Sequence, residues 1–323
     1  MKVLFVSSGK VNNTPGPIVL EQGNSLIKKG ISLEFFTVNE RGLIGHVKEI
    51  FRLRRLTGNS SFDIIHAHYG TSALVAAFAK GNAKKVISFM GDDILGSNRK
   101  DGTVTRKSLF LASINKLNAK HVYDFSIMKS EEMSSRLKGE KKIVIPNGVD
   151  CDIFKPIEKE KAAKKLKWDV NIKRVIFVSH PSRAEKNYEL AKKVIELIND
   201  KSVQLVTVHG VEQHDLVNFY NAADAIILTS FHEGSPNVIK EAMACNCPIV
   251  STDVGDVKML LENVDGCYIT DFEPENIKKA VLKAIDHREK NNYTNGRDKI
   301  MKMKLDSVSV AERIIDLYKT LLK

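Results

Sequence analysis

Residues Leu228–Ala244 read Leu-Thr-Ser-Phe-His-Glu-Gly-Ser-Pro-Asn-Val-Ile-Lys-Glu-Ala-Met-Ala, which predicts the end of a buried strand, a loop and a helix. Ser235 and Pro236 are typical of a helix N-cap and a first helical residue, and Gly234 allows a ligand to approach the backbone closely. The first-turn amides of such a helix lack backbone partners and its dipole favours an anion, so a diphosphate fits there.

Glu241 is expected at the edge of the apolar face of this helix. Helical geometry places it about 60° from the apolar residue Val238. A carboxylate there can accept two charge-assisted hydrogen bonds from a vicinal diol such as a ribose, each worth roughly 1.5–3 kcal/mol. The alternative is a plain helix start with a solvated Glu241, and this segment alone leaves both open.

Short β-branched segments alternate with amphipathic helical segments throughout the chain, as in parallel sheets built from βαβ units. In the second half, strands are expected at Arg174–Ser179, Val203–Val208, Ala225–Thr229, Pro248–Ser251 and Gly266–Ile269. In the first half, they are expected at Val3–Val6, Leu33–Val38, Asp63–His68, Val86–Phe89, Val122–Ile127 and Ile143–Ile145. The pattern therefore predicts two doubly wound α/β domains.

The segment Ile145–Asp150, Ile-Pro-Asn-Gly-Val-Asp, separates the two halves. Pro146 ends a strand and Gly148 permits a sharp turn, so we expect a hinge here. The predicted domains are residues 1–147 and 148–305, followed by a closing helix at 306–323. The apolar residues of that helix recur at helical spacing and require a surface to pack on: Val310, Ile314, Leu317 and Leu321.

Several segments together resemble a known family. Glu233 and Glu241 stand eight residues apart and are followed by Pro248-Ile-Val-Ser-Thr252 and Gly255, which resembles the Glu-x7-Glu signature of glycosyltransferase family 4. The resemblance covers nearly the whole chain and includes three further segments, Phe62–His68, Ile145–Asp150 and Ala222–Asp224. It implies a retaining enzyme of the GT-B fold, in which two Rossmann-like domains face each other across a cleft. It also implies that the nucleotide lies against the second domain, the acceptor against the first, and the closing helix on the first.

The resemblance implies roles for residues of the second domain. Glu241 matches the residue that holds the nucleotide ribose, and Glu233 matches the one near the hydroxyls of the donor sugar. Lys186 matches a lysine that neutralises the departing diphosphate, whereas the usual Gly-Arg is replaced here by Ser179-His180. We therefore assign Arg183 as the second cation, with a solvated basic loop as the alternative. The other donor-binding candidates are Gly234, Ser235, Pro236, Asn237 and His180.

Two loops of the first domain are expected near the ligands. Thr14-Pro-Gly-Pro-Ile18 follows the first strand, where the family has a glycine-containing loop close to the donor phosphate, so Gly16 is a donor-binding candidate. Met90, Gly91 and Asp92 follow another strand, where many relatives show His-Gly, and a methionine cannot donate the hydrogen bond of that histidine. Asp92 and Asp93 are interpreted as a loop acceptor or a helix cap.

His66 and His68 share one face of a predicted strand. No third zinc ligand is near, so a cleft-facing or hydrogen-bonded core role is expected for His68, and no metal site is predicted. The four cysteines are also too irregularly spaced for a zinc site or a disulfide framework, which favours free thiols.

The net charge of +11 is unevenly distributed. Residues 1–147 contain 23 Lys and Arg against 12 Asp and Glu, whereas residues 148–323 contain 27 of each. Such asymmetry predicts that the first domain meets an anionic surface or ligand. A nucleic acid is not expected, because basic and aromatic residues are not interleaved. No segment has the roughly 18 consecutive apolar residues of a membrane span, and the N-terminus is unlike a signal peptide, so a cytoplasmic location is expected.

The predicted helix Leu43–Leu56 combines an apolar stripe with a row of cations. The stripe consists of Leu43, Ile44, Val47, Ile50 and Phe51, and the row of Lys48, Arg52 and Arg55. The pattern is typical of a helix at a membrane interface. A stripe packed on the first sheet with a solvated basic row is the alternative, and both can hold together.

Together these features predict an enzyme that transfers a hexose-type sugar from a nucleoside-diphosphate sugar to a glycan or lipid-linked acceptor in cell-surface polysaccharide or glycolipid biosynthesis. No cofactor or metal is expected, and the reaction implied is front-face transfer with retention. Two alternatives remain, a sugar-nucleotide epimerase on the same fold and a non-catalytic basic binding protein. The base, the sugar and the acceptor stay open because a few pocket contacts decide them.

Overall fold

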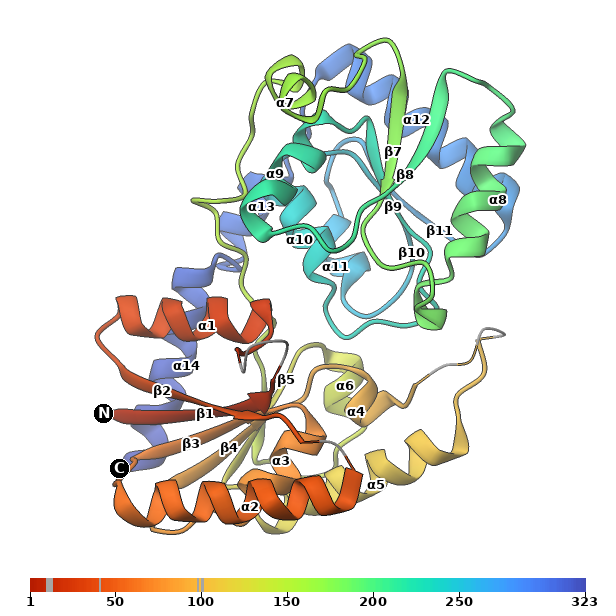
Figure 1. Cartoon of the computed structure of the whole chain (residues 1–323). Coiled ribbons are helices and arrows are strands. Elements are labelled where there is room, and N and C mark those ends of the chain that lie inside the picture. Colours follow the sequence, from red (N-terminus) through yellow and green to blue (C-terminus); the bar gives the residue numbers. More distant parts are fainter. Residues whose placement is uncertain (10–13, 41, 98, 100–101) are drawn as a thin grey trace. The chain divides into compact units, whose positions relative to one another are not determined.

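The computed structural model describes residues 1–9, 14–40, 42–97, 99 and 102–323, which form two compact units. The first unit comprises Met1–Ser97, Val104–Gly148 and Ser307–Lys323, and the second contains Val149–Asp306. Each unit has its own parallel sheet with helices on both faces (Figure 1). The α/β class and the two doubly wound domains predicted from the sequence are confirmed.

The sheet of the first unit has six parallel strands in the order β2-β1-β3-β4-β5-β6. The strands are β1 (Lys2–Ser8), β2 (Ser32–Val38), β3 (Ile64–His68), β4 (Lys84–Ser88), β5 (Phe125–Met128) and β6 (Lys142–Val144). The order reverses beside β1, which is a topological switch point, and ligands of such sheets bind beyond the carboxyl ends of the strands. The first-unit candidate loops follow β1, β3 and β4 at this edge.

The helices of the first unit cover both faces of its sheet. They are α1 (Pro17–Lys28), α2 (Gly42–Asn59), α3 (Gly70–Ala76), α4 (Asp92–Leu95), α5 (Arg106–His121), α6 (Glu131–Ser135) and α14 (Ser307–Leu322). Side chains alternate along β1, so Val3 and Phe5 pack beneath α1 and α14, whereas Leu4 and Val6 pack towards α2, α3 and α5 (Figure 1). The closing helix α14 thereby buries Val310, Ile314 and Leu317 in the first unit.

The sheet of the second unit has five parallel strands in the order β11-β10-β9-β7-β8. The strands are β7 (Lys173–Phe177), β8 (Val203–Thr207), β9 (Ala225–Leu228), β10 (Ile249–Thr252) and β11 (Cys267–Thr270). The helices are α7 (Lys159–Leu166), the short 3-10 helix η2 (Ala184–Lys186), α8 (Tyr188–Ile198), α9 (Gln213–Ala222), α10 (Asn237–Ala244), α11 (Val257–Leu261), α12 (Pro274–Asn291) and α13 (Gly296–Lys302). One core lies beneath α9, α10 and α11, and the other beneath α8 and α12.

The two ends of the second unit are joined to each other. Val149 donates its N–H to the carbonyl of Leu305 at 3.0 Å, and it forms an isolated parallel bridge with Asp306. Arg297 donates to the carbonyls of Phe154 and Cys151 at 2.7 and 2.9 Å. The segment after the predicted hinge is thus fastened to α13 and to the chain just before α14.

The apolar stripe of α2 is largely exposed. Leu43, Ile44, Val47 and Phe51 are 90%, 78%, 50% and 69% exposed. The alternative that the whole stripe packs on the first sheet is therefore wrong. Of the five residues of the stripe, Ile50 contacts the core. The buried face of α2, roughly on the opposite side of the helix, consists of Gly45, Glu49, Leu53 and Thr57.

Glu49 explains this orientation of α2. Its carboxylate accepts the N–H groups of Asn39 and Glu40, at 2.9 and 3.2 Å, which fixes the chain just after β2. Arg52 pairs with Glu49 at 2.6 Å and lies 4.2 Å from the ring centroid of Phe36. Arg52 is exposed but paired within the fold, and the other exposed cations of α2 are Lys48, Arg54 and Arg55.

Among the described residues, no helix combines the length and the apolar composition that crossing a bilayer requires. All four cysteines are free, and Cys245 and Cys247 are buried, as expected from their spacing.

Candidate active site

Lys186 and Glu233 meet at the carboxyl edge of the second sheet. Lys186 ends η2, the short helix that follows β7, and Glu233 lies in the loop after β9. Their side chains form an ion pair, and Ser230 donates its hydroxyl to the same carboxylate oxygen at 2.7 Å. Thr229 donates to the carbonyls of Lys186 and Asn187, at 3.1 and 2.9 Å, which holds the two loops together. The structure therefore brings together two residues that lie 47 positions apart in the sequence.

Arg183 lies apart from this pair. Its side chain is exposed and makes an ion pair with Glu185 at 2.5 Å. His180 is also exposed, its ring lies 4.6 Å from that of His209, and its Nδ1 accepts the N–H of Ser182. Lys186 is thus the predicted cation that contacts Glu233, whereas Arg183 and His180 lie on the outer part of the same loop.

Glu241 is held by a residue that the sequence analysis missed. The hydroxyl of Tyr220, a fully buried side chain of α9, donates to Glu241 Oε2 at 2.6 Å. Burial raises the pKa of Glu241, while the Tyr220 hydrogen bond and the charge of Lys240 lower it. No sequence signal links Tyr220 to Glu241, because the contact depends on how α9 packs beside α10. Glu241 itself is partly exposed and can accept further hydrogen bonds with its other oxygen.

The helix after Gly234 begins one residue later than expected. Pro236 occupies the N-cap position of α10 and Asn237 is the first helical residue. Ser235 does not cap the helix, and its hydroxyl accepts a hydrogen bond from Lys240 Nζ at 2.8 Å. No side chain caps the N-terminus of α10, and the helix dipole favours an anion at this end, so the anion site expected from the sequence stays a prediction.

In the first unit, Asp93 rather than Asp92 organises the loop after β4. The Asp93 carboxylate accepts the N–H groups of Met90, Gly91 and Gly70, each at 3.0 Å. Gly91 has a φ of 139°, which an L-residue rarely adopts, so the loop depends on this glycine. Asp92 lies at the start of α4, and its carboxylate accepts the Ser97 hydroxyl at 3.3 Å. Burial raises the pKa of Asp93 to about 6, against the lowering effect of the three N–H donors.

His68 is a buried residue of the first unit. Its ring stacks on that of His66, with centroids 4.2 Å apart, and is 2% exposed. His66 in turn contacts the hydroxyls of Tyr318 and Ser88 at 2.5 and 2.8 Å. Burial lowers the pKa of both histidines. Among the described residues, no three His, Cys, Asp or Glu side chains are grouped so that they could hold a metal ion.

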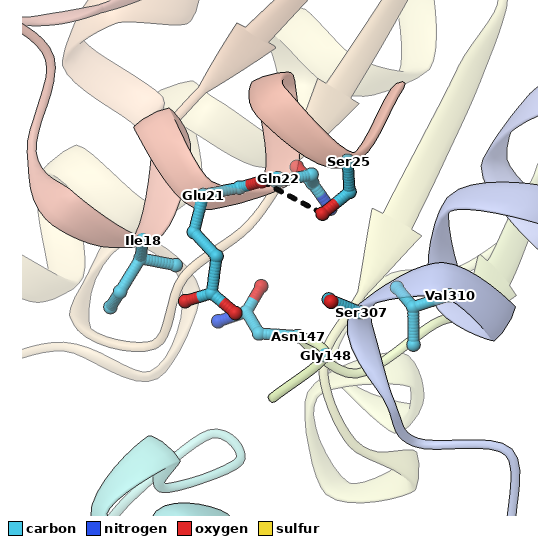
Figure 2. Close-up of a pocket in the computed structure, with 8 residues that line it drawn as sticks. All are labelled: Ile18, Glu21, Gln22, Ser25, Asn147, Gly148, Ser307 and Val310. Carbon is cyan, nitrogen blue, oxygen red and sulfur yellow. Dashed lines mark hydrogen bonds between the residues drawn. The ribbon is translucent and has the colours of Figure 1, made fainter. Parts of the chain in front are cut away.

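Gly16 lies immediately before α1, at its N-cap, and no side chain caps that helix either. A small pocket lies farther along α1, between that helix, Asn147–Gly148 and the start of α14 (Figure 2). Glu21, Gln22 and Ser307 line it, and its volume of about 10 Å³ suits about one water molecule. None of the predicted site residues lines this pocket, so it is separate from the candidate site.

Two family models match the chain. "Glycosyl transferase 4-like" matches residues 18–125, within the first unit, and "Glycosyl transferases group 1" matches residues 161–287, within the second. The chain is 26% identical over 221 residues to the protein named as the teichuronic acid biosynthesis glycosyltransferase TuaC of Bacillus subtilis. That match covers 61% of this chain and 55% of TuaC, so it spans about half the length of the relative.

Solved structures show the same fold over the full length. Sucrose-phosphate synthase from Thermosynechococcus elongatus superposes with a TM-score of 0.77 at 15% identity, covering 99% of this chain and 98% of that one. HepE of Anabaena, in complex with UDP and glucose, superposes with a TM-score of 0.73 at 17% identity, covering 99% of this chain and 100% of that one. At these identities the likeness concerns the fold.

Proposed function

We propose that the chain is a glycosyltransferase of the GT-B fold and the GT4 type, and that it transfers a hexose-type sugar from a nucleoside-diphosphate sugar to a glycan or lipid-linked acceptor. The observation that carries the proposal is the arrangement of Glu233, Lys186 and Glu241 around the uncapped start of α10. Two carboxylates and a cation beside a helix N-terminus suit a ligand with hydroxyls on both sides of a diphosphate. The structures of HepE with UDP and UDP-glucose support a donor of this kind.

Each residue then has a role in the transfer. Glu241, oriented by Tyr220, accepts the ribose hydroxyls, and Glu233 accepts a hydroxyl of the donor sugar. The diphosphate lies at the N-terminus of α10, where the helix dipole favours an anion, and Lys186 stabilises the charge that grows on it as the sugar departs. The positive charge required comes from the chain itself, so the proposal includes no metal or other cofactor. With the leaving diphosphate accepting the proton of the acceptor, the sugar is transferred from the same face and its configuration is retained.

The experiment that tests the donor class is a thermal-shift screen of the wild type with UDP, GDP and ADP sugars. A ligand at 100 times its dissociation constant adds about 2.7 kcal/mol of stability. At the same ligand concentration, Glu241→Gln should lower the added stability by about half, as a roughly tenfold loss of affinity requires, whereas Glu196→Gln, an exposed glutamate of α8, should keep it. Absence of a shift with every nucleotide sugar would contradict the proposal. A shift combined with a changed sugar in the absence of acceptor would indicate the epimerase instead.

The partner of the first unit is proposed to be an anionic lipid leaflet. The exposed residues Leu43, Ile44, Val47 and Phe51 of α2 lie beside Lys48, Arg54 and Arg55. The excess positive charge of the chain also lies in its first half. An apolar stripe flanked by cations suits the headgroup region of a membrane, where a lipid-linked acceptor would be found. Together with the four free thiols, which suit a reducing compartment, this favours the cytoplasmic face of a membrane.

A further inference from the structure

Helix α5 of the first unit also leaves large apolar residues exposed. Phe110 and Leu117 are 65% and 58% exposed, and they lie on one side of the helix because seven residues make about two turns. The residues that α5 buries lie roughly on the opposite side, namely Ala112, Asn115 and Ala119. Single exposed apolar residues are common, whereas a group of them marks a contact surface. The outer side of α5 is therefore a second candidate surface beside the stripe of α2.

The charges of α2 and α5 indicate which partner fits this surface. Over residues 42–59 and 106–121, all of which the structure describes, each helix contains four Lys or Arg, and the one acidic residue of the two helices, Glu49, is buried. Neither helix therefore exposes an acidic side chain. Apolar residues among cations alone suit the headgroup region of an anionic leaflet. A nucleic acid would match the cations but not the apolar residues.

The two helices cover the same face of the first sheet. Leu53 of α2 and Ala119 of α5 belong to one core, and Figure 1 shows both helices on the lower side of the sheet. Since each helix buries one side against the unit, their outer sides face away from the sheet in the same general direction. A single flat surface can therefore contact both helices.

The apolar residues are concentrated towards the carboxyl edge of this sheet. Leu43, Ile44 and Val47 lie in the first half of α2, which begins just after β2. Asn115, near the middle of α5, donates to the carbonyl of Asp93 at 2.9 Å, in the loop region after β4. The first half of α5, with the exposed residues 109–111, therefore lies at or beyond the same edge.

We propose that α5 is a second membrane contact, and that the first unit docks on an anionic leaflet through the first halves of α2 and α5 together. The proposal rests on the membrane partner proposed above from α2, and it adds a second helix and an orientation. The carboxyl edge of the first sheet then lies closest to the leaflet. A lipid-linked acceptor bound there reaches the loop Met90–Asp92 from the leaflet surface.

Tryptophan emission in the presence of vesicles tests the second contact. The vesicles consist of phosphatidylglycerol and brominated phosphatidylcholine, whose bromine atoms quench a tryptophan inserted among the acyl chains. Phe110→Trp should lose about half of its added emission, and Leu117→Trp, farther from the carboxyl edge, should lose less. The matched control is Leu282→Trp, an exposed position of α12, because that helix also exposes Glu275, Asp286 and Glu289. It should show no quenching beyond that of the wild type, whose Trp168 supplies the background.

Phe51→Trp separates the second contact from the first. Quenching of Phe51→Trp without Phe110→Trp would overturn the role of α5 and leave the contact through α2 in place. Quenching of neither would overturn both, and equal quenching of Leu282→Trp would show adsorption without a preferred surface and overturn the orientation. The donor screen tests sugar transfer separately from all of these outcomes.

Co-sedimentation with the same vesicles tests the charges of α5. Reversing Arg106, Lys107 and Lys120 to Glu should weaken binding about a hundredfold. Reversing Lys279, Lys283 and Lys290 of α12, which are also exposed, should change it little. Equal effects of the two reversals, or equal binding to vesicles of phosphatidylcholine alone, would contradict an anionic leaflet as the partner of α5.

Discussion

At the scale of single residues, the proposed contact of Glu241 with the ribose can be tested at Glu241 and at Tyr220, which donates a hydrogen bond to it. Glu241→Ala removes the charged acceptor and should weaken nucleoside-diphosphate binding about tenfold or more. Tyr220→Phe removes one hydrogen bond of about 0.5–1.5 kcal/mol and should weaken it less, by about two- to tenfold, because Glu241 then loses its fixed orientation. Calorimetry with UDP measures both, with Glu196→Gln as the control. An unchanged affinity of Glu241→Ala would show that the ribose lies elsewhere.

Substitution of the two candidate cations in the loop after β7 should lower kcat to very different extents. Lys186 is buried against Glu233, whereas Arg183 is exposed and paired with Glu185. Lys186→Ala should lower kcat about a hundredfold while changing nucleoside affinity less, because its charge matters most as the diphosphate departs. Arg183→Ala should change kcat by less than about fivefold. Steady-state kinetics beside calorimetry separates the two quantities, and equal losses of kcat and affinity in Lys186→Ala would indicate uniform binding.

Asp93 gives the stability a pH dependence of known sign. Its pKa is raised to about 6 in the folded protein from an ordinary value of 3.8, so the folded state holds the proton more tightly than the unfolded state. Between about pH 4 and pH 6 the contribution of Asp93 to the free energy of unfolding therefore falls as the pH rises. Relative to Asp93→Asn, which does not titrate, the wild type should gain up to about 3 kcal/mol between pH 7 and pH 4.

Urea unfolding of both proteins at pH 7, 5.5 and 4 measures this difference. Other titrating groups are shared by the two proteins, so they cancel in the comparison. A difference that stays constant with pH would show that the buried carboxylate is not protonated in this window.

At the scale of single elements, α14 is the clearest test of packing. Ile314 is fully buried against the first sheet, whereas Leu322, near the end of the same helix, is 44% exposed. Ile314→Ala should lower the free energy of unfolding by about 2–5 kcal/mol, because it removes buried methyl groups and leaves a cavity. Leu322→Ala should stay within about 0.5 kcal/mol. Equal effects of the two substitutions, measured by urea denaturation, would contradict this packing of α14.

The elements also show what could be predicted from the sequence. Periodicity located the strands to within three residues, for example Ile64–His68 against the expected Asp63–His68, because buried parallel strands are continuous apolar runs. The sequence assigned Lys186 and Glu233 to one donor site, but it did not predict their ion pair, which forms because the two residues follow neighbouring strands. Tyr220 could not be found in this way, since its contact with Glu241 depends on how α9 packs beside α10. The start of α10 differs by one residue from the expected start, and the Ser235 hydroxyl accepts a hydrogen bond from Lys240.

The orientation of α2 was the largest departure. An apolar stripe normally marks the buried side of a helix. On α2 the exposed stripe contains more large apolar residues than the face that is buried. On α2 the side that carries Glu49 is buried instead of the apolar stripe. The Glu49 carboxylate accepts two backbone N–H groups just after β2, which holds this side of the helix against the first unit. This contact joins residues about ten positions apart and depends on the conformation of the loop between them. The periodicity of apolar residues contains no information on that conformation.

At the scale of the whole molecule, the exposed face of α2 and the charge asymmetry lead to one prediction. The wild type should bind vesicles that contain anionic lipid at low salt and dissociate as the salt concentration rises, because each cation near the surface contributes about 1 kcal/mol and salt screens it. Reversing Lys48, Arg54 and Arg55 to Glu should weaken binding by a hundredfold or more. Arg52 is left unchanged, since its pairing with Glu49 belongs to the fold.

Vesicle co-sedimentation decides between this surface and a general effect of charge. The matched control reverses Lys192, Lys193 and Lys201, three exposed lysines of the second unit, and should bind nearly as well as the wild type. A second variant, Leu43→Ser with Phe51→Ser, keeps every cation and should lose the part of the binding that resists salt, because apolar burial is not screened. Circular dichroism confirms that each variant is folded. Equal sedimentation of all variants would exclude α2 as the membrane contact, and no binding of the wild type at low salt would favour an acceptor in solution.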